Sequence, residues 1–168
     1  MIAIKPHHFV DIITALGDGR RTYEPHAYGH AVHTVAALIL GDPDVELQME
    51  LGADDICAPC RHNLGGHCDD VIDTSYRPLA PRSKGEWNRR IDERWCARLG
   101  LEPGARLTAR RFCELLLDLP PDTGEVVYCE VPREMTAARL RQLQAGVRCF
   151  LGEASPPPRR AAATGGRR

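Results

Sequence analysis

The sequence has no long uninterrupted apolar segment. A helix that crosses a bilayer needs about 20 apolar residues in succession, and no stretch of the 168-residue chain approaches that length. The first residues, MIAIKPHHFVDIITALG, lack the basic start and continuous apolar run of a secretory signal, because His7, His8 and Asp11 interrupt them. We therefore predict a cytoplasmic protein without membrane contact, in a compartment where thiols stay reduced.

The chain also has little excess charge of either sign, with a formal net charge of -1. Residues 154–168 contain no acid and four arginines, so the rest of the chain carries a net charge of -5. An acidic body is a poor match for a phosphate backbone, and we expect no nucleic-acid partner. The run SPPPRRAAATGGRR has almost nothing to bury. We predict a domain over residues 1–152 and a disordered tail over residues 153–168.

Signatures of common enzyme classes are missing. The sequence contains no Gly-rich phosphate loop, no GxSxG and no HExxH, and it has no internal repeat. It therefore names no catalytic residue and leaves open whether the protein is an enzyme.

The apolar periodicity that is present predicts an α+β fold, a mostly helical single domain with a small two-stranded sheet and a Cys-rich loop. Apolar and polar residues alternate at residues 2–4 and 45–51, which predicts strands there. Helices are expected at residues 9–17, 25–40, 83–99, 108–119 and around 140–147, with caps at Ser83 and Thr108 and stops at Gly17 and Gly100. We expect the helical residues Trp87, Trp95, Cys96 and Cys113 to be buried.

The Cys-rich loop is DDICAPCRHNLGGHCDD, residues 54–70. Cys57 and Cys60 have the spacing that lets two thiolates face one zinc or iron centre at about 2.3 Å. Gly65 and Gly66 allow the chain to fold back so that Cys68 returns to the same point. Two other interpretations stay open: a thiol–disulfide motif of the CAPC type, and a turn whose cysteines are small apolar fillers.

A fourth ligand is best sought on the first helix. Asp11 lies opposite the apolar stripe of that helix, and His7 lies four residues earlier on the same side. The alternative for Asp11 is a solvated polar face, in which case His67 is the next candidate and His7 the one after. His26, His30 and His33 form one stripe of the predicted second helix, which we expect to face solvent.

Four segments together resemble a known family. They are IKPHHFVDIITALG, LGADDICAPC, the HC that follows and LGLEPGARLTARRF, and they span roughly Ile2 to Leu117. They are similar to domain of unknown function 1284, a family of small bacterial and archaeal proteins described as iron–sulfur-binding. The resemblance implies that Cys57, Cys60 and Cys68 are cluster ligands. The family helix carries a cysteine where this chain has Asp11.

These observations predict an iron–sulfur protein that acts in electron transfer or redox sensing with a redox or protein partner that the sequence does not identify. A 4Fe–4S cluster held by Cys57, Cys60, Cys68 and Asp11 would have one labile iron, because a carboxylate binds iron less firmly than a thiolate does. The alternative is a structural zinc module that serves a protein-interaction domain, since three thiolates and a carboxylate also suit tetrahedral zinc.

Overall fold

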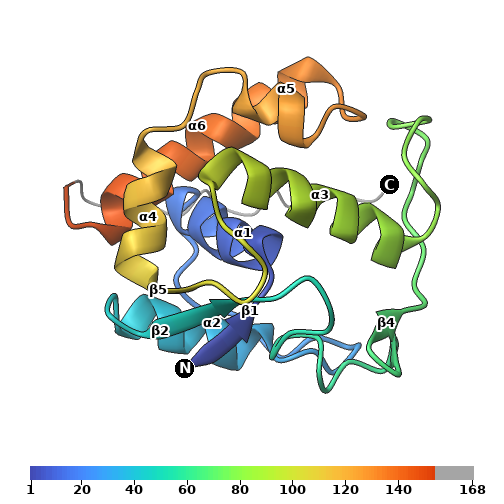
Figure 1. Cartoon of the computed structure of the whole chain (residues 1–168), viewed down its shortest axis with the longest axis horizontal. Helices are drawn as coiled ribbons and strands as arrows, with labels where there is room; N and C mark the ends of the chain where they lie inside the picture. The colour runs from blue at the N-terminus through green and yellow to red at the C-terminus, as the bar shows by residue number, and fades with distance from the viewer. Residues whose placement is uncertain (154–168) are drawn as a thin grey trace, which may run out of the picture.

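The computed structural model describes residues 1–153, and the predicted tail otherwise lies outside the described residues. The chain forms one α+β domain (Figure 1). Its elements in order are β1 (Ile2–Ile4), α1 (Pro6–Gly17), α2 (Val32–Gly41), β2 (Glu46–Met49), β3 (Asn63–Leu64), β4 (His67–Cys68), α3 (Lys84–Leu99), β5 (Arg106–Thr108), α4 (Ala109–Leu117), α5 (Thr123–Val127) and α6 (Arg133–Phe150).

The main sheet has three strands in the order β1-β2-β5. The two strands predicted from alternation are β1 and β2, and they pair in parallel with Ile2 opposite Leu47. Strand β5 was not predicted; it pairs antiparallel with β2 and places Leu107 opposite Leu47. The sheet is therefore larger by one strand than the predicted two-stranded one.

A separate hairpin, β3–β4, lies within the Cys-rich loop. Asn63 pairs with Cys68 and Leu64 with His67, so the turn consists of Gly65 and Gly66. Both glycines have positive φ angles, 60° and 91°, which a residue with a Cβ rarely adopts. The predicted fold-back at these two glycines is confirmed.

Local signals placed most helix ends correctly. The Ser83 hydroxyl accepts a hydrogen bond from the backbone N–H of Glu86 at 3.2 Å, and the Thr108 hydroxyl accepts one from Arg111 at 3.1 Å. Gly100 ends α3 in the left-handed conformation, with a φ of 65°. These caps work because they satisfy backbone groups that have no partner inside the helix.

The predicted start of the second helix was wrong. Helix α2 begins at Val32 and not at Pro25, and residues 20–31 form an irregular segment. Long-range bonds hold this segment: Ala31 donates its N–H to the carbonyl of Ile56, and the Tyr28 carbonyl accepts from Arg61, both at 2.9 Å. The three histidines of the predicted stripe therefore do not share a helix.

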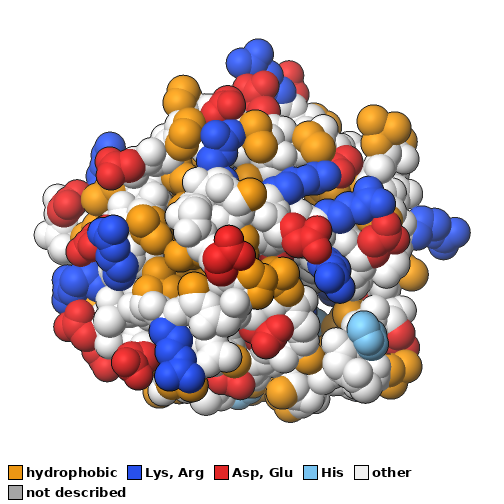
Figure 2. Space-filling view, viewed as in Figure 1, with side chains coloured by type: hydrophobic (Ala, Val, Ile, Leu, Met, Phe, Trp, Pro, Cys, Tyr) orange, Lys and Arg blue, Asp and Glu red, His pale blue; other side chains and the backbone are white. Residues whose placement is uncertain are grey.

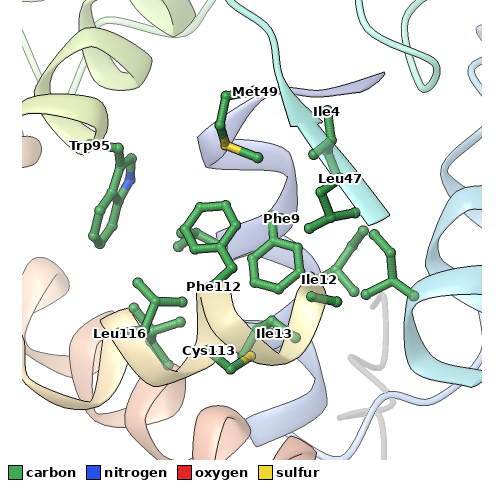
Figure 3. Packing of buried hydrophobic residues seen from close by; sticks show 14 of the residues in the cluster. Ile4, Phe9, Ile12, Ile13, Leu47, Met49, Trp95, Phe112, Cys113 and Leu116 are labelled. Carbon is green, nitrogen blue, oxygen red and sulfur yellow. The ribbon is translucent and has the colours of Figure 1, made fainter. Parts of the chain in front are cut away.

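The core lies where α1 meets the sheet and the later helices. Figure 1 shows α1 near the middle of the molecule, with α3, α4 and α6 around it and the strands beneath. The rings of Phe9 and Phe112 stack with centroids 4.3 Å apart, close to Leu47 and Met49 (Figure 3). The residues predicted to be buried, Trp87, Trp95, Cys96 and Cys113, are all buried.

The surface shows no dominant sign of charge on the face drawn in Figure 2, where acidic and basic side chains alternate. Within residues 1–153, no helix is both long enough and apolar enough to cross a membrane.

Candidate metal centre

Asp54 anchors the Cys-rich loop to the start of the chain. Its carboxylate is almost fully buried and accepts hydrogen bonds from the backbone N–H groups of Lys5 and Cys57, each at 2.9 Å. The Nδ1 atom of His8 lies 2.6 Å from the same carboxylate. One side chain therefore joins the loop to the first turn of α1, across 49 residues of sequence.

The protonation states of this pair follow from their contacts. Burial raises the pKa of Asp54, but the hydrogen bond from His8 and the two backbone donors outweigh it and hold the pKa well below its usual range. Burial and the neighbouring His7 charge lower the pKa of His8. Asp54 is therefore ionised at neutral pH, and the His8 ring is neutral, with Nδ1–H donating to Asp54 and Nε2 left open.

The three loop cysteines line one cavity of about 830 Å³. Cys57 and Cys60 belong to a turn closed by the N–H of Cys60 donating to the Cys57 carbonyl at 2.9 Å. The β3–β4 hairpin carries Cys68 back to the same wall, where it packs against Gly85 at the start of α3. A smaller hollow of about 20 Å³ is also lined by all three cysteines.

The thiol of Cys57 lies between two charged side chains, Lys5 and Asp54. The Lys5 ammonium lies 3.4 Å from its sulfur. Burial and the Asp54 charge raise the pKa of the thiol to about 11, against the opposing effect of Lys5. Ligand atoms of Cys57, Asp54 and His8 lie within 4.8 Å of one another, and this is the one such group of three metal-ligating side chains within residues 1–153.

His62 is the site residue that the sequence analysis missed. Its Nδ1 lies 2.8 Å from the Asp69 carboxylate, and its Nε2 is buried with no hydrogen-bond partner among the described residues. The ring lines both cavities beside the cysteines. The sequence did contain a signal for this pair, because a two-residue Gly-Gly turn fixes the register of a hairpin and sets His62 opposite Asp69. In the structure, Asp69 donates its N–H to the His62 carbonyl at 3.0 Å.

The predicted fourth ligands lie in different environments. Asp11 lines the large cavity, but its carboxylate forms an ion pair with Arg139 of α6. His7 is buried and contacts Asp92 of α3 at 2.8 Å through Nδ1. His67 is exposed at the tip of the hairpin. The first-helix residues His7 and Asp11 thus contact separate helices.

Cys57, Cys60, Cys68 and His62 line one cavity, and the Asp69 carboxylate orients the His62 imidazole, as carboxylates do for metal-bound histidines. Among the described residues, no three ligand atoms of these four side chains lie within 4.8 Å of one another, so the structure brings them to one wall but not to ligand distance. Comparisons of the chain with protein-family models, curated proteins and solved structures found no match. The resemblance noted in the sequence therefore stays a prediction.

Proposed function

We propose that this protein binds an iron–sulfur cluster through Cys57, Cys60, Cys68 and His62 and acts in electron transfer or redox sensing. The observation that carries the proposal is the His62 Nε2 atom, buried and unpartnered beside three cysteines on the wall of one cavity. An unsatisfied buried nitrogen is costly unless a ligand completes it. Thiolates with imidazole are an established ligand combination for iron–sulfur clusters.

The chain's own residues have definite tasks around such a cluster. Asp69 orients the His62 ring, and Asp54 fixes the turn that carries Cys57 and Cys60. The Lys5 ammonium, 3.4 Å from the Cys57 sulfur, offsets part of the negative charge of the thiolates. When bound, the cluster would supply one-electron chemistry.

We favour His62 over Asp11 as the fourth donor. The Asp11 carboxylate is already neutralised by Arg139, and binding a metal would leave that guanidinium without its partner. His62 loses nothing by binding, because its Nε2 has no other contact to give up. The proposal includes a cytoplasmic location, where the free thiols of the loop stay reduced.

Structural zinc is the second candidate, and the small hollow favours it. The hollow of about 20 Å³ that Cys57, Cys60, Cys68 and His62 help to line is room for one ion and not for a cluster. The four donor atoms would have to move closer to bind it, since no three of them lie within 4.8 Å of one another among the described residues. Three cysteines and one histidine are also an established ligand set of structural zinc. In that case the centre would stabilise the hairpin as a surface for a protein partner.

Metal analysis of protein purified without oxygen tests the proposal. A cluster predicts brown protein with broad visible absorption and near-equal amounts of iron and sulfide. One zinc per chain with no colour selects the second candidate. Protein that holds neither metal after anaerobic reconstitution contradicts both.

Three variants test the ligand set. His62→Ala should lose most of the metal, whereas Asp11→Ala and the exposed control His67→Ala should retain it. Loss in Asp11→Ala with retention in His62→Ala would identify Asp11 as the fourth donor instead.

A further inference from the structure

A second cavity, of about 340 Å³, adjoins the metal-centre cavity at Asp11 and Asn88. Its walls come from α1, α3, α6, the loop at residues 76–77 and the segment between α5 and α6. None of the loop cysteines lines it. The volume lies at the lower end of the range for ligand pockets, about 300–1,000 Å³, which suits a single-ring molecule.

Arg77 brings a positive charge to this cavity without a neutralising partner in its wall. Its Nε donates to the carbonyl of Asp73 at 2.8 Å, and its guanidinium lies over the rings of Tyr76 and Trp87, 4.8 and 5.0 Å from their centroids. Within residues 1–153 it forms no ion pair with a carboxylate inside 4 Å. The Asp73 carboxylate, whose pKa Arg77 helps to lower, does not line the cavity.

Arg139 offers a donor that has no acceptor. One of its terminal nitrogens pairs with Asp11, and its guanidinium lies over the Tyr128 ring, 5.1 Å from the centroid. Its Nε is buried and has no hydrogen-bond partner among the described residues. A buried charged donor without an acceptor is costly, and Arg139 lines the cavity.

The charges of the wall add up to one excess cation. Asp11 neutralises Arg139, and Asp92 faces His7 at 2.8 Å, which leaves Arg77 unbalanced. The cavity is also lined by the apolar side chains of Ile91, Val131 and Met135. A ligand that suits both kinds of lining residue carries a single negative charge on one end and an apolar body on the other.

We propose that this cavity binds a small organic monocarboxylate, with its carboxylate held by Arg77 and Arg139 and its apolar ring packed against Trp87 and Met135. Guanidinium groups match a carboxylate because they donate parallel N–H bonds to both oxygens. The rings of Tyr76, Trp87 and Tyr128 line the cavity, and each has an arginine over one face, so a flat apolar body would pack against their remaining surface. This site does not depend on the metal centre.

Titration of the full chain with benzoate tests the proposal. Calorimetry should detect one site with a Kd of about 1 mM or tighter, which is ordinary for so small a ligand. Benzyl alcohol, which has the same ring without the charge, should bind at least about tenfold more weakly. In NMR spectra, benzoate should shift the indole signal of Trp87, which lines the cavity, more than that of Trp95, which does not.

The arginine variants make the test specific. Arg77→Gln should weaken benzoate binding at least about tenfold, and it removes no ion pair of the fold. Arg110→Gln, which alters a surface arginine paired with Asp44, is the matched control and should bind like the parent. Equal binding of benzoate and benzyl alcohol, unchanged binding by Arg77→Gln, or no saturation by benzoate would each overturn the proposal.

Discussion

Asp54 shows how one buried charge organises the candidate centre. Its carboxylate receives two backbone N–H groups and the His8 ring, and no water reaches it. Breaking such an arrangement leaves donors unsatisfied in a site that excludes solvent. The neighbouring Asp55 is a useful contrast, because it is exposed and accepts one bond, from the N–H of Ala3 at 2.9 Å.

Replacement of the two acids should therefore have unequal effects. Asp54→Ala should lower the free energy of unfolding by about 3 kcal/mol, since it leaves several buried donors without an acceptor at once. Asp55→Ala should cost no more than about 1 kcal/mol, the value of one ordinary hydrogen bond. Urea unfolding of the metal-free proteins measures both. Equal costs would mean that Asp54 does not anchor the loop.

His7 and His8 should make stability depend on pH in opposite directions. Burial lowers the pKa of His7, but Asp92 outweighs it, so the folded-state pKa lies above the unfolded value of 6.5. The contribution of His7 to the free energy of unfolding is complete below pH 6.5 and is lost as the pH rises through the folded-state pKa. The folded pKa of His8 lies below 6.5, so its contribution is complete above that pH and is lost as the pH falls.

The contribution of His7 and His8 to the free energy of unfolding of the metal-free protein should therefore be largest near pH 6.5. Urea unfolding between about pH 5 and 8 measures the two limbs of the curve. His7→Gln should remove the decline on the alkaline side, and His8→Gln the decline on the acidic side. A curve that keeps both limbs in each variant would assign the pH dependence to other groups.

At the scale of elements, α1 and α6 cross at unusually close range. A Cβ placed on Gly146 would lie 1.8 Å from the Ile13 carbonyl oxygen, and one on Gly17 would lie 1.9 Å from that of Gln142. Both contacts are with backbone atoms, so no side-chain movement relieves them. The two glycines therefore set how closely the first and last helices pack.

Gly146→Ala should destabilise the fold by at least about 3 kcal/mol, because the helices must separate. That cost exceeds the gain of about 1 kcal/mol in helix propensity. Gly41→Ala, at the end of α2 with no atom within 4 Å of the new Cβ, is the matched control and should change stability by less than about 1 kcal/mol. Thermal unfolding followed by circular dichroism checks both. A neutral Gly146→Ala would show that the crossing is not tightly packed.

Elements with local signals were predictable, and those fixed by distant contacts were not. The Ser83 hydroxyl caps the start of α3, and the Gly100 backbone N–H donates to the Cys96 carbonyl at its end. The start of α2 instead depends on Ile56 accepting from Ala31, and β5 exists because it pairs with β2. A helical pattern over residues 25–40 carries no trace of either contact.

The same distinction holds for the candidate site. The spacing of Cys57, Cys60 and Cys68 predicted one metal-binding point, and the glycine turn between Cys60 and Cys68 does bring all three to one cavity. Their three sulfurs do not all lie within 4.8 Å of one another, so the ligand set stays a prediction. The pairing of Asp11 with Arg139 spans 128 residues, so no pattern around Asp11 reveals it. His62 was overlooked because its significance lies in one unpartnered nitrogen, which only the surrounding packing defines.

At the scale of the molecule, α1 connects three parts of the fold through one polar edge. His7 contacts Asp92 of α3, His8 contacts Asp54 of the Cys-rich loop, and Asp11 contacts Arg139 of α6. The helical core is packed around Phe9 and Phe112, and Ile56 is the loop residue buried in it. The rest of the loop is held by polar contacts, among them two backbone bonds to residues 20–31. We therefore expect the loop to open separately from the core.

Metal binding should make this separation visible by hydrogen exchange. Opening of residues 54–70 must release a bound ion, so hydrogen exchange there slows by the factor 1 + [metal]/Kd. The slowing is about a hundredfold when the free zinc concentration is a hundred times its Kd. Amides of α3 between Trp87 and Leu99 should change little, because they stay packed whether or not metal is bound. His62→Ala should lose most of the slowing, and Cys129→Ser, which alters an exposed thiol outside the loop, should keep it. Slowing spread evenly over α3 and the loop would mean that the two open as one unit, and no slowing in the loop would place the zinc elsewhere.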